Sequence, residues 1–199
     1  MPTTDFAPML ALPYEKIEDD DARWNWDGQR KVDGIRAMVY LGPQGKRVLT
    51  RVKGKHSGEY GVKTEHLPWL PDTEKDYVFD GELLWGNSSR KCMEILGCYP
   101  TESLRRQEAT HPMCFVAYDI LVGWGINLCP RPYFQRREAL FDHGSFVAMS
   151  LDHKFQISTG TPMPAPSGSA PRVLSGKASS SRNRSVPTSA VVVPRTGSR

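Results

Sequence analysis

The segment "GQRKVDGIRAMVY", residues 28–40, places a lysine just before a sharp bend that leads into a strand. Asp33-Gly34 is a dipeptide typical of tight turns. From residue 35 to 41 apolar side chains alternate with Arg36, Met38 and Tyr40, a spacing of two that predicts a β-strand. A lysine at such a bend is ordinarily a solvated turn residue. The alternative is that Lys31 is a nucleophile presented at the mouth of the strand.

The chain around this segment reads as alternating strands and helices. Residues 35–52 predict a β-hairpin, because "GPQGK" separates two strand-like runs. Two further strands are expected at 76–85 and 114–122, where nearly continuous apolar runs predict burial on both faces. These patterns predict a mixed α and β fold rather than an all-helical one.

Three helices are expected between and after the strands. The predicted helices are "NSSRKCMEILG" (87–97), "TESLRRQEA" (101–109) and "RPYFQRREALFDHG" (131–144). Asn87 or Ser88 is the expected N-cap of the first helix and Thr101 that of the second, and Gly97 and Gly144 are the expected stops of the first and third. His143 would then complement the dipole at the end of the third helix.

Composition divides the chain near residue 153. All 22 acidic residues lie at or before Asp152, so the body carries nineteen basic residues and a net charge near −3, whereas 154–199 holds seven basic residues and no acid. This second segment is rich in Ser, Pro and Gly, and it offers too little apolar surface to offset its ordering entropy. We expect a folded unit at 1–153 and a disordered tail at 154–199, in which "SAVVVP" is too short and isolated to found a sheet.

Other features exclude several classes of protein. The cysteines form no C-x-x-C pair and the five histidines no H-x-x-x-H pair, which argues against a zinc site or a disulfide framework. No apolar run approaches the roughly 18 residues of a membrane helix. The N-terminal segment lacks the basic start of a signal peptide. We therefore expect a cytoplasmic protein without membrane association.

Charged side chains in apolar strands point to a chemical site. Glu82 interrupts one otherwise apolar strand, and Tyr118 and Asp119 interrupt another. A carboxylate there is costly unless it meets a donor, cation or metal. A lysine attacks phosphorus or carbon only as the neutral amine, which nearby positive charge from Arg36 or a metal would favour. Tyr118 could stack on a base, and Arg51 could clamp a phosphate.

Together these segments resemble the nucleotidyltransferase domain of ATP-dependent DNA ligases. The matching motifs are "KVDGIR" (31–36), "TR" (50–51), "FDGELL" (79–84), "FVAYDIL" (115–121) and "RPYFQRREAL" (131–140). The first matches the family's K-x-D-G-x-R nucleophile motif in full, and order and spacing agree from residue 9 to about 145. The resemblance implies an α+β fold: a partial nucleotidyltransferase (ATP-grasp-like adenylation) domain with antiparallel sheets flanked by helices.

The resemblance also implies roles for individual residues. Lys31 would attack the α-phosphorus of ATP and form lysyl-AMP, from which AMP passes to the 5′-phosphate of nicked duplex DNA before the strand is sealed. Arg36 would contact the nucleotide sugar or phosphate, and Arg51 the nick phosphate or nucleotide. Glu82 would hold the ribose or Mg²⁺, and Tyr118 would stack on adenine. The expected enzyme is a monomer that uses ATP and Mg²⁺.

The match to the family ends early. After the aromatic-Asp strand the family continues with an E-G-hydrophobic strand, a K-x-K strand and an OB-fold domain, and none of these follows in this sequence. The abrupt change in composition suggests the hypothesis of a truncated gene or a translated alternative frame. Activity is therefore expected to be impaired or absent, since losing one electrostatic group at such a site costs roughly 10²–10³ in rate.

Two other interpretations stay open. An mRNA capping guanylyltransferase or an RNA ligase would share the Lys-x-Asp-Gly nucleophile, and would differ in base and polynucleotide preference. The chain could also be a nonfunctional remnant, or a nucleic-acid binder acting through its basic tail, without enzymatic activity.

Overall fold

The computed structural model of the chain describes residues 6, 26–53, 58–86, 88–149, 151–162 and 190–194. The strands are β1 (Trp26–Arg30), β2 (Ile35–Gly42), β3 (Gly45–Lys53), β4 (Tyr60–Val62), β5 (Tyr77–Leu84), β6 (Cys114–Gly123), β7 (Ile126–Asn127), β8 (Phe155–Ile157), β9 (Gly160–Pro162) and β10 (Ala190–Pro194). The helices are the 3-10 helix η3 (Thr64–His66) and the α-helices α1 (Ser89–Leu96), α2 (Pro100–Ala109) and α3 (Tyr133–Met149).

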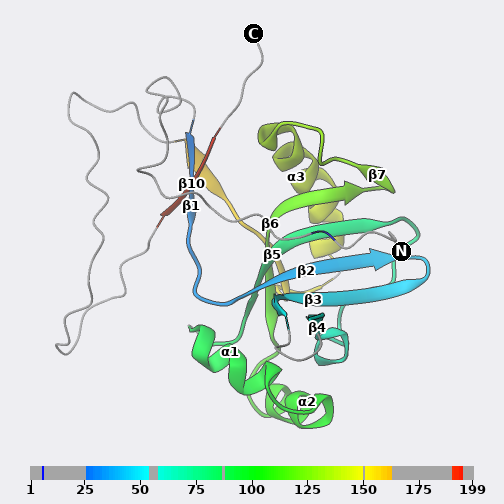
Figure 1. Cartoon of the computed structure of the whole chain (residues 1–199), viewed down its shortest axis with the longest axis vertical. Coiled ribbons are helices and arrows are strands. Elements are labelled where there is room, and N and C mark those ends of the chain that lie inside the picture. The colour runs from blue at the N-terminus through cyan, green and yellow to red at the C-terminus, as the bar shows by residue number, and fades with distance from the viewer. Residues whose placement is uncertain are drawn as a thin grey trace, which may run out of the picture.

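A seven-stranded sheet forms the centre of the fold (Figure 1). Its strands follow the order β4-β3-β2-β5-β6-β7, and β8 pairs with β6. Every pairing in it is antiparallel except the parallel pairing of β6 with β8. The expected hairpin and both expected strands are therefore confirmed, as is an antiparallel sheet flanked by helices.

The central strands are buried on both faces, as their apolar runs predict. One core cluster includes Val39 and Phe79 and packs against residues of α1 and α3. A second, smaller cluster on the other face includes Met38, Tyr40 and Val78. Met38 and Tyr40 follow Arg36 at intervals of two along β2, so the smaller cluster shares its sheet face with the arginine.

Helix α1 begins and ends as expected, whereas the predicted N-cap of α2 and the predicted C-terminal end of α3 are wrong. The Ser88 Oγ accepts a hydrogen bond from the Lys91 amide at 3.3 Å, and Gly97 is the C-cap of α1. Thr101 does not cap α2. Tyr99 is the N-cap, and Pro100 takes the first helical position, where a missing amide hydrogen costs nothing.

Helix α3 continues five residues beyond the predicted stop at Gly144. A Cβ at Gly144 would lie 3.1 Å from the Ile157 side chain, so this glycine serves close packing against β8 rather than termination. His143 is consequently inside the helix, not at its C-terminus, and the dipole interpretation is wrong. Its ring lies 5.2 Å from that of Trp124.

A second sheet has the order β10-β1-β9, and both of its pairings are antiparallel. The expectation that "SAVVVP" founds no sheet is wrong, because β10 pairs with β1 along its whole length. Consecutive valines favour extended backbone, and the partner strand comes from the other end of the sequence. Residues 163–189 and 195–199 of the predicted tail lie outside the described residues.

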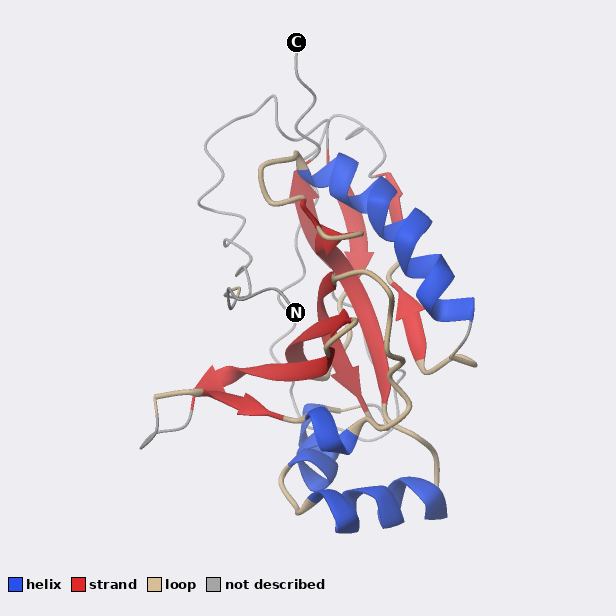
Figure 2. Cartoon of the chain, turned by 90° about the vertical axis from the view of Figure 1, so that its right-hand side faces the viewer, coloured by secondary structure: helices blue, strands red, loops and turns tan. Residues whose placement is uncertain are grey.

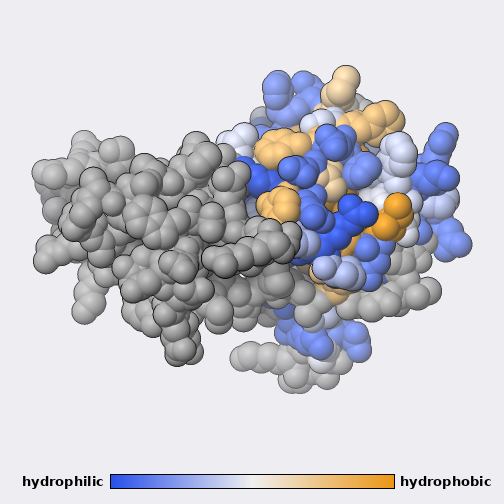
Figure 3. Space-filling view, turned by 90° about the horizontal axis from the view of Figure 1, so that it is seen from above, coloured by the Kyte–Doolittle hydropathy of each residue, from blue (hydrophilic) through white to orange (hydrophobic). Residues whose placement is uncertain are grey.

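Helices α1 and α2 lie together beyond one end of the large sheet, whereas α3 runs along the sheet near β6 (Figures 1 and 2). On the face seen in Figure 3, the hydrophobic residues of the described part are interspersed with hydrophilic ones. Within the described ranges, no helix combines the length and the hydropathy needed to span a bilayer.

Candidate functional site

The carboxylate of Glu82 joins three separate sequence motifs. The Gly34 amide donates a hydrogen bond to its Oε1 at 2.9 Å, and the Tyr118 hydroxyl donates to its Oε2 at 2.8 Å. Pairing of the strands dictates this meeting, since Arg36 of β2 is directly opposite Glu82 of β5, and β6 pairs with β5 on the other side. The bend after Lys31, the second Asp-Gly strand and the aromatic-Asp strand therefore converge on one side chain.

Both Asp-Gly motifs use the small size of glycine to bring backbones together. A Cβ on Gly34 would lie 2.3 Å from the Leu83 carbonyl oxygen and 2.8 Å from Cγ of Glu82. A Cβ on Gly81 would lie 2.2 Å from the Val116 carbonyl oxygen. Any larger residue at these two positions would push the three motifs apart.

Arg36 is bound to the buried Asp80. Its Nε and Nη2 donate to the two carboxylate oxygens of Asp80, both at 2.7 Å, which is the strong bidentate arrangement. Burial raises the pKa of Asp80, and the bonds from Arg36 offset part of that rise. The guanidinium also lies 5.2 Å from the centre of the Tyr118 ring, a cation–π contact. Arg36 thus reaches the same site as Glu82 and Tyr118.

Tyr118 is half-buried, and its environment keeps its hydroxyl protonated. Burial raises the pKa of this hydroxyl, and the neighbouring charge of Glu82 raises it further. The hydroxyl therefore remains a hydrogen-bond donor to Glu82 across the physiological range of pH. That bond fixes the orientation of the ring.

A buried ion pair lies beside Tyr118, and its arginine is not among the residues that the sequence predicts for the site. Arg136 of α3 donates to the Asp119 carboxylate, with Nη2 and Oδ2 separated by 2.6 Å and exposures of only 9% and 6%. The Tyr133 hydroxyl also donates to the Tyr118 carbonyl oxygen at 3.4 Å. A carboxylate in an apolar strand requires such a partner, so Asp119 was the feature of the sequence that indicated a buried cation. Sequence alone does not say which arginine answers it.

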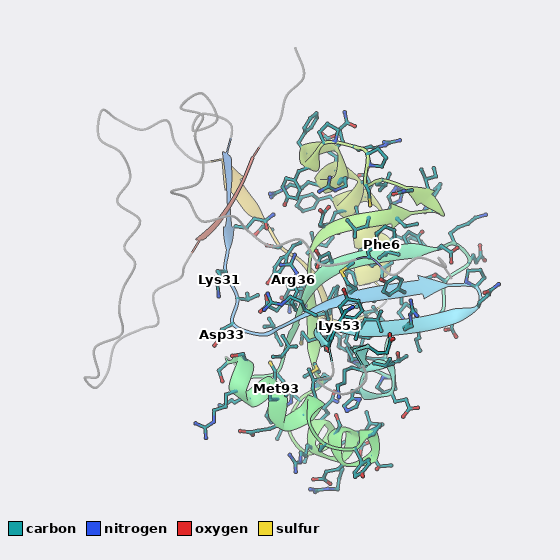
Figure 4. The ribbon with its side chains drawn as sticks, viewed as in Figure 1. Phe6, Lys31, Asp33, Arg36, Lys53 and Met93 are labelled. Atoms are coloured by element: carbon teal, nitrogen blue, oxygen red, sulfur yellow. The ribbon has the colours of Figure 1, made fainter. Side chains whose placement is uncertain are left out.

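Lys31 lies next to this group rather than within it. The side chain is exposed on the segment between β1 and β2, close to Asp33 (Figure 4). Lys31 and Gly34 are three positions apart, so their Cα atoms are within about 11 Å of one another. The flexible side chain of Lys31 can add further reach toward a ligand bound at Glu82.

Arg51 lies apart from the hydrogen-bonded group. It is exposed on β3, and it makes no hydrogen bond or ion pair with another described residue. The structure therefore brings together Arg36, Glu82 and Tyr118, with Lys31 on the adjoining bend and Arg51 on a neighbouring strand.

The oxygen atoms at this site could contribute to binding one Mg²⁺ ion, provided that a substrate supplies most of its ligands. Mg²⁺ prefers oxygen ligands and commonly takes one or two carboxylates together with phosphates and water. Each oxygen of Glu82 accepts one hydrogen bond and retains another lone pair, whereas Asp80 is engaged by Arg36. No cluster of three or more His, Cys, Asp or Glu side chains suited to a metal occurs in the described part of the chain. Glu82 can therefore contribute one ligand, but the described residues do not form a closed cage.

Comparison with known proteins identifies the family of the chain. Residues 8–161 match the family model described as "ATP dependent DNA ligase domain". Over 149 residues the chain is 25% identical to DNA ligase 1 of Dictyostelium discoideum, a match that covers 71% of this chain and 12% of that protein. The chain thus corresponds to a small part of this relative.

Two solved structures share the fold. One, described as "Pmar-Lig_Pre.", superposes with a TM-score of 0.55 at 15% identity and covers 78% of this chain and 35% of its own. The other comes from a study of DNA binding with a minimal scaffold in Lig E DNA ligases. It superposes with a TM-score of 0.50 at 18% identity and covers 80% of this chain and 53% of its own.

Proposed function

The chain belongs to the family of ATP-dependent DNA ligase domains, and from this premise we propose that it is the adenylation domain of an enzyme that seals nicked duplex DNA through lysyl-AMP. The observation that carries the proposal is the convergence of Gly34 and Tyr118 on the carboxylate of Glu82. It gives one location to three motifs whose family role is to hold a nucleotide. We assign the adenylation unit to residues 1–153 together with β8, which extends the same sheet.

The first step forms a bond between Nζ of Lys31 and the α-phosphorus of ATP, while the bond from that phosphorus to pyrophosphate breaks. The attacking amine must be neutral, and as the P–N bond forms its nitrogen becomes positively charged and releases one proton to water. The lysyl-AMP then gives AMP to the 5′-phosphate at the nick. In the last step the 3′-hydroxyl attacks that phosphate and AMP leaves.

The surrounding side chains position the nucleotide for this attack. The Tyr118 ring, oriented by its bond to Glu82, stacks on adenine. Arg36 keeps one guanidinium nitrogen, Nη1, outside its two bonds to Asp80 and directs it to the sugar or a phosphate. Glu82 binds the ribose or a metal ion. Mg²⁺, if held there, would supply positive charge that offsets the negative charge on the phosphate oxygens in the transition state.

Arg51 extends the site toward the DNA. Its exposed guanidinium is suited to a bidentate contact with the 5′-phosphate at the nick. The reaction requires no second copy of the chain in this proposal, and we place it in the cytoplasm.

Labelling with nucleotides tests the proposal. The chain is incubated with Mg²⁺ and either α-labelled ATP or α-labelled GTP, and then chased with nicked duplex DNA. We expect slow covalent labelling by ATP, since the impairment expected from the sequence would lower the rate without moving the nucleophile, and transfer of that label to the 5′-phosphate of the nick. Label from GTP alone would support the capping-enzyme interpretation, and no covalent label from either nucleotide would contradict the proposed function.

A further inference from the structure

Arg51 and Lys53, near the end of β3, differ from two nearby lysines whose side chains are bound to backbone carbonyl groups. Lys46 donates to the Leu70 carbonyl oxygen, and Lys63 donates to the Leu96 carbonyl oxygen at 2.6 Å. Arg51 and Lys53 are exposed and have no carboxylate or carbonyl partner among the described residues. Their charges are therefore available to an external anion.

Lys53 is nevertheless held in place. It is directly opposite Tyr60 in the pairing of β3 with β4, and its Nζ lies 4.7 Å from the centre of the Tyr60 ring. Tyr60 packs in turn against the core cluster that contains Met38 and Tyr40. These two residues alternate with Arg36 on one face of β2, so Lys53 is anchored to the sheet face that carries the candidate site.

Strands β3 and β4 form a second hairpin, and the end of this hairpin projects from the body of the protein. Figure 2 shows β3 and β4 extending together away from the sheet. Its base is fixed, since the Lys63 amide donates to the Val48 carbonyl oxygen at 2.9 Å. At the other end, a Cβ added to Gly58 would meet no atom within 4 Å. Among the described residues at this end of the hairpin, Glu59 is the one that carries a negative charge.

We propose that Lys53, positioned by Tyr60, binds the sugar–phosphate backbone of duplex DNA beside the nick. Lys53 and Tyr60, together with the neighbouring Arg51 that faces the 5′-phosphate, form what we call the basic arm. This inference rests on the proposed function and adds a surface to it. A cation with no internal partner, held by a ring that is itself packed on the core, loses little conformational freedom when it meets a phosphate. Contacts of this kind position a duplex without reading its sequence. Tyr60 acts by positioning Lys53.

Salt dependence of binding tests the basic arm. Wild-type chain and Lys53→Gln are titrated with labelled nicked duplex DNA at several salt concentrations. Each phosphate contact adds about 0.9 to the slope of log affinity against log salt, so the slope should fall by about one in Lys53→Gln. The advantage of the wild type should shrink about 3.5-fold between roughly 50 and 200 mM salt. The loss should be equal for duplexes of different sequence.

Two further variants complete the test. Tyr60→Leu keeps an apolar side chain against the core but removes the ring beneath Lys53, and we expect an affinity between those of wild type and Lys53→Gln. Lys75→Gln removes an exposed lysine in the turn before β5 and should behave like the wild type. Thermal melting of each variant reports whether it is folded.

Failure of the basic arm can be distinguished from failure of the proposed function. If folded Lys53→Gln has the same affinity and salt slope as the wild type, the basic arm is a solvated surface and the inference is wrong. Covalent labelling of the wild type by ATP is measured in the same preparations. Its absence would count against the proposed function, whereas the slopes still report on the arm.

Discussion

The amide of Gly34 donates a hydrogen bond to Oε1 of Glu82 across 2.9 Å, although the two residues are 48 positions apart in the sequence. This bond ties the bend that carries Lys31 to the second strand of the site. The other carboxylate oxygen receives the hydroxyl of Tyr118, so one side chain sets the positions of three motifs. Replacing Glu82 should therefore affect chemistry more than folding.

Glu82→Gln tests that expectation. The amide retains one acceptor oxygen, but it lacks the charge and one of the two acceptors, so we expect the rate of lysyl-AMP formation to fall by about 10²–10³. The melting temperature should fall by roughly 2–12 °C, since an exchange of this kind costs about 1–3 kcal/mol. Glu108→Gln, on an exposed position of α2, is the matched control and should keep the wild-type rate. An unchanged rate in Glu82→Gln would remove this residue from the site.

Two variants of Tyr118 separate its ring from its hydroxyl. Tyr118→Phe retains the stacking surface and loses one hydrogen bond, so the dissociation constant for ATP should rise by less than about tenfold. Tyr118→Leu loses the ring, and stacking is worth about 1–3 kcal/mol per base, which predicts a rise of roughly 5-fold to 150-fold. Isothermal titration with ATP measures both. Equal losses in the two variants would argue against stacking on adenine.

The pH dependence of stability tests the pair of Arg36 and Asp80. Burial raises the pKa of Asp80 above its ordinary value of 3.8, and Arg36 limits the rise. A carboxyl group with a raised folded-state pKa stabilises the fold fully below its unfolded pKa, and this contribution is lost as the pH rises through the folded pKa. In Arg36→Met the pKa of Asp80 should rise further, so the variant should be destabilised more near pH 7 than near pH 4.

Urea unfolding at the two pH values measures the effect, which we expect to reach about 3 kcal/mol near neutral pH. The double variant Arg36→Met, Asp80→Asn carries no ionisable group at either position. Its difference from the wild type should depend much less on pH. A destabilisation of Arg36→Met that is the same at both pH values would show that Asp80 is not the charge that Arg36 compensates.

Sequence reasoning predicted the parts of the structure that depend on local pattern. The hairpin of β2 and β3 and the buried strands β5 and β6 follow from alternation and from continuous apolar runs. The Ser88 cap follows from the same kind of local signal. Arg36, Glu82 and Tyr118 meet because adjacent strands bring their motifs into register, which the order of the motifs already suggested.

Distant packing decided what the sequence did not reveal. Gly144 resembles a helix stop, but its small size serves the contact with Ile157. The strand at 190–194 depends on β1, far away in the sequence, and so its short length gave no sign of it. Arg136 was one of several arginines on a predicted helix, and only the fold places it against Asp119.

That buried pair yields a further prediction. Removing one partner of a buried ion pair costs about 3–5 kcal/mol, because the other charge stays uncompensated. Arg136→Met should therefore destabilise the protein by this amount, and adding Asp119→Asn should restore a large part of the loss. Unfolding free energies of both single variants and of the double variant form the cycle. Strictly additive losses would mean that the two side chains do not interact in solution.

The central claim is that Nζ of Lys31 becomes bonded to the phosphorus of AMP. The direct measurement is mass spectrometry of the folded chain after incubation with Mg²⁺ and ATP, followed by mapping of the modified peptide. We expect one AMP per chain, attached at Lys31, with no adduct in Lys31→Ala and an unchanged adduct in Lys75→Ala. An adduct that persists in Lys31→Ala, or a folded wild-type chain that acquires none, would contradict the account.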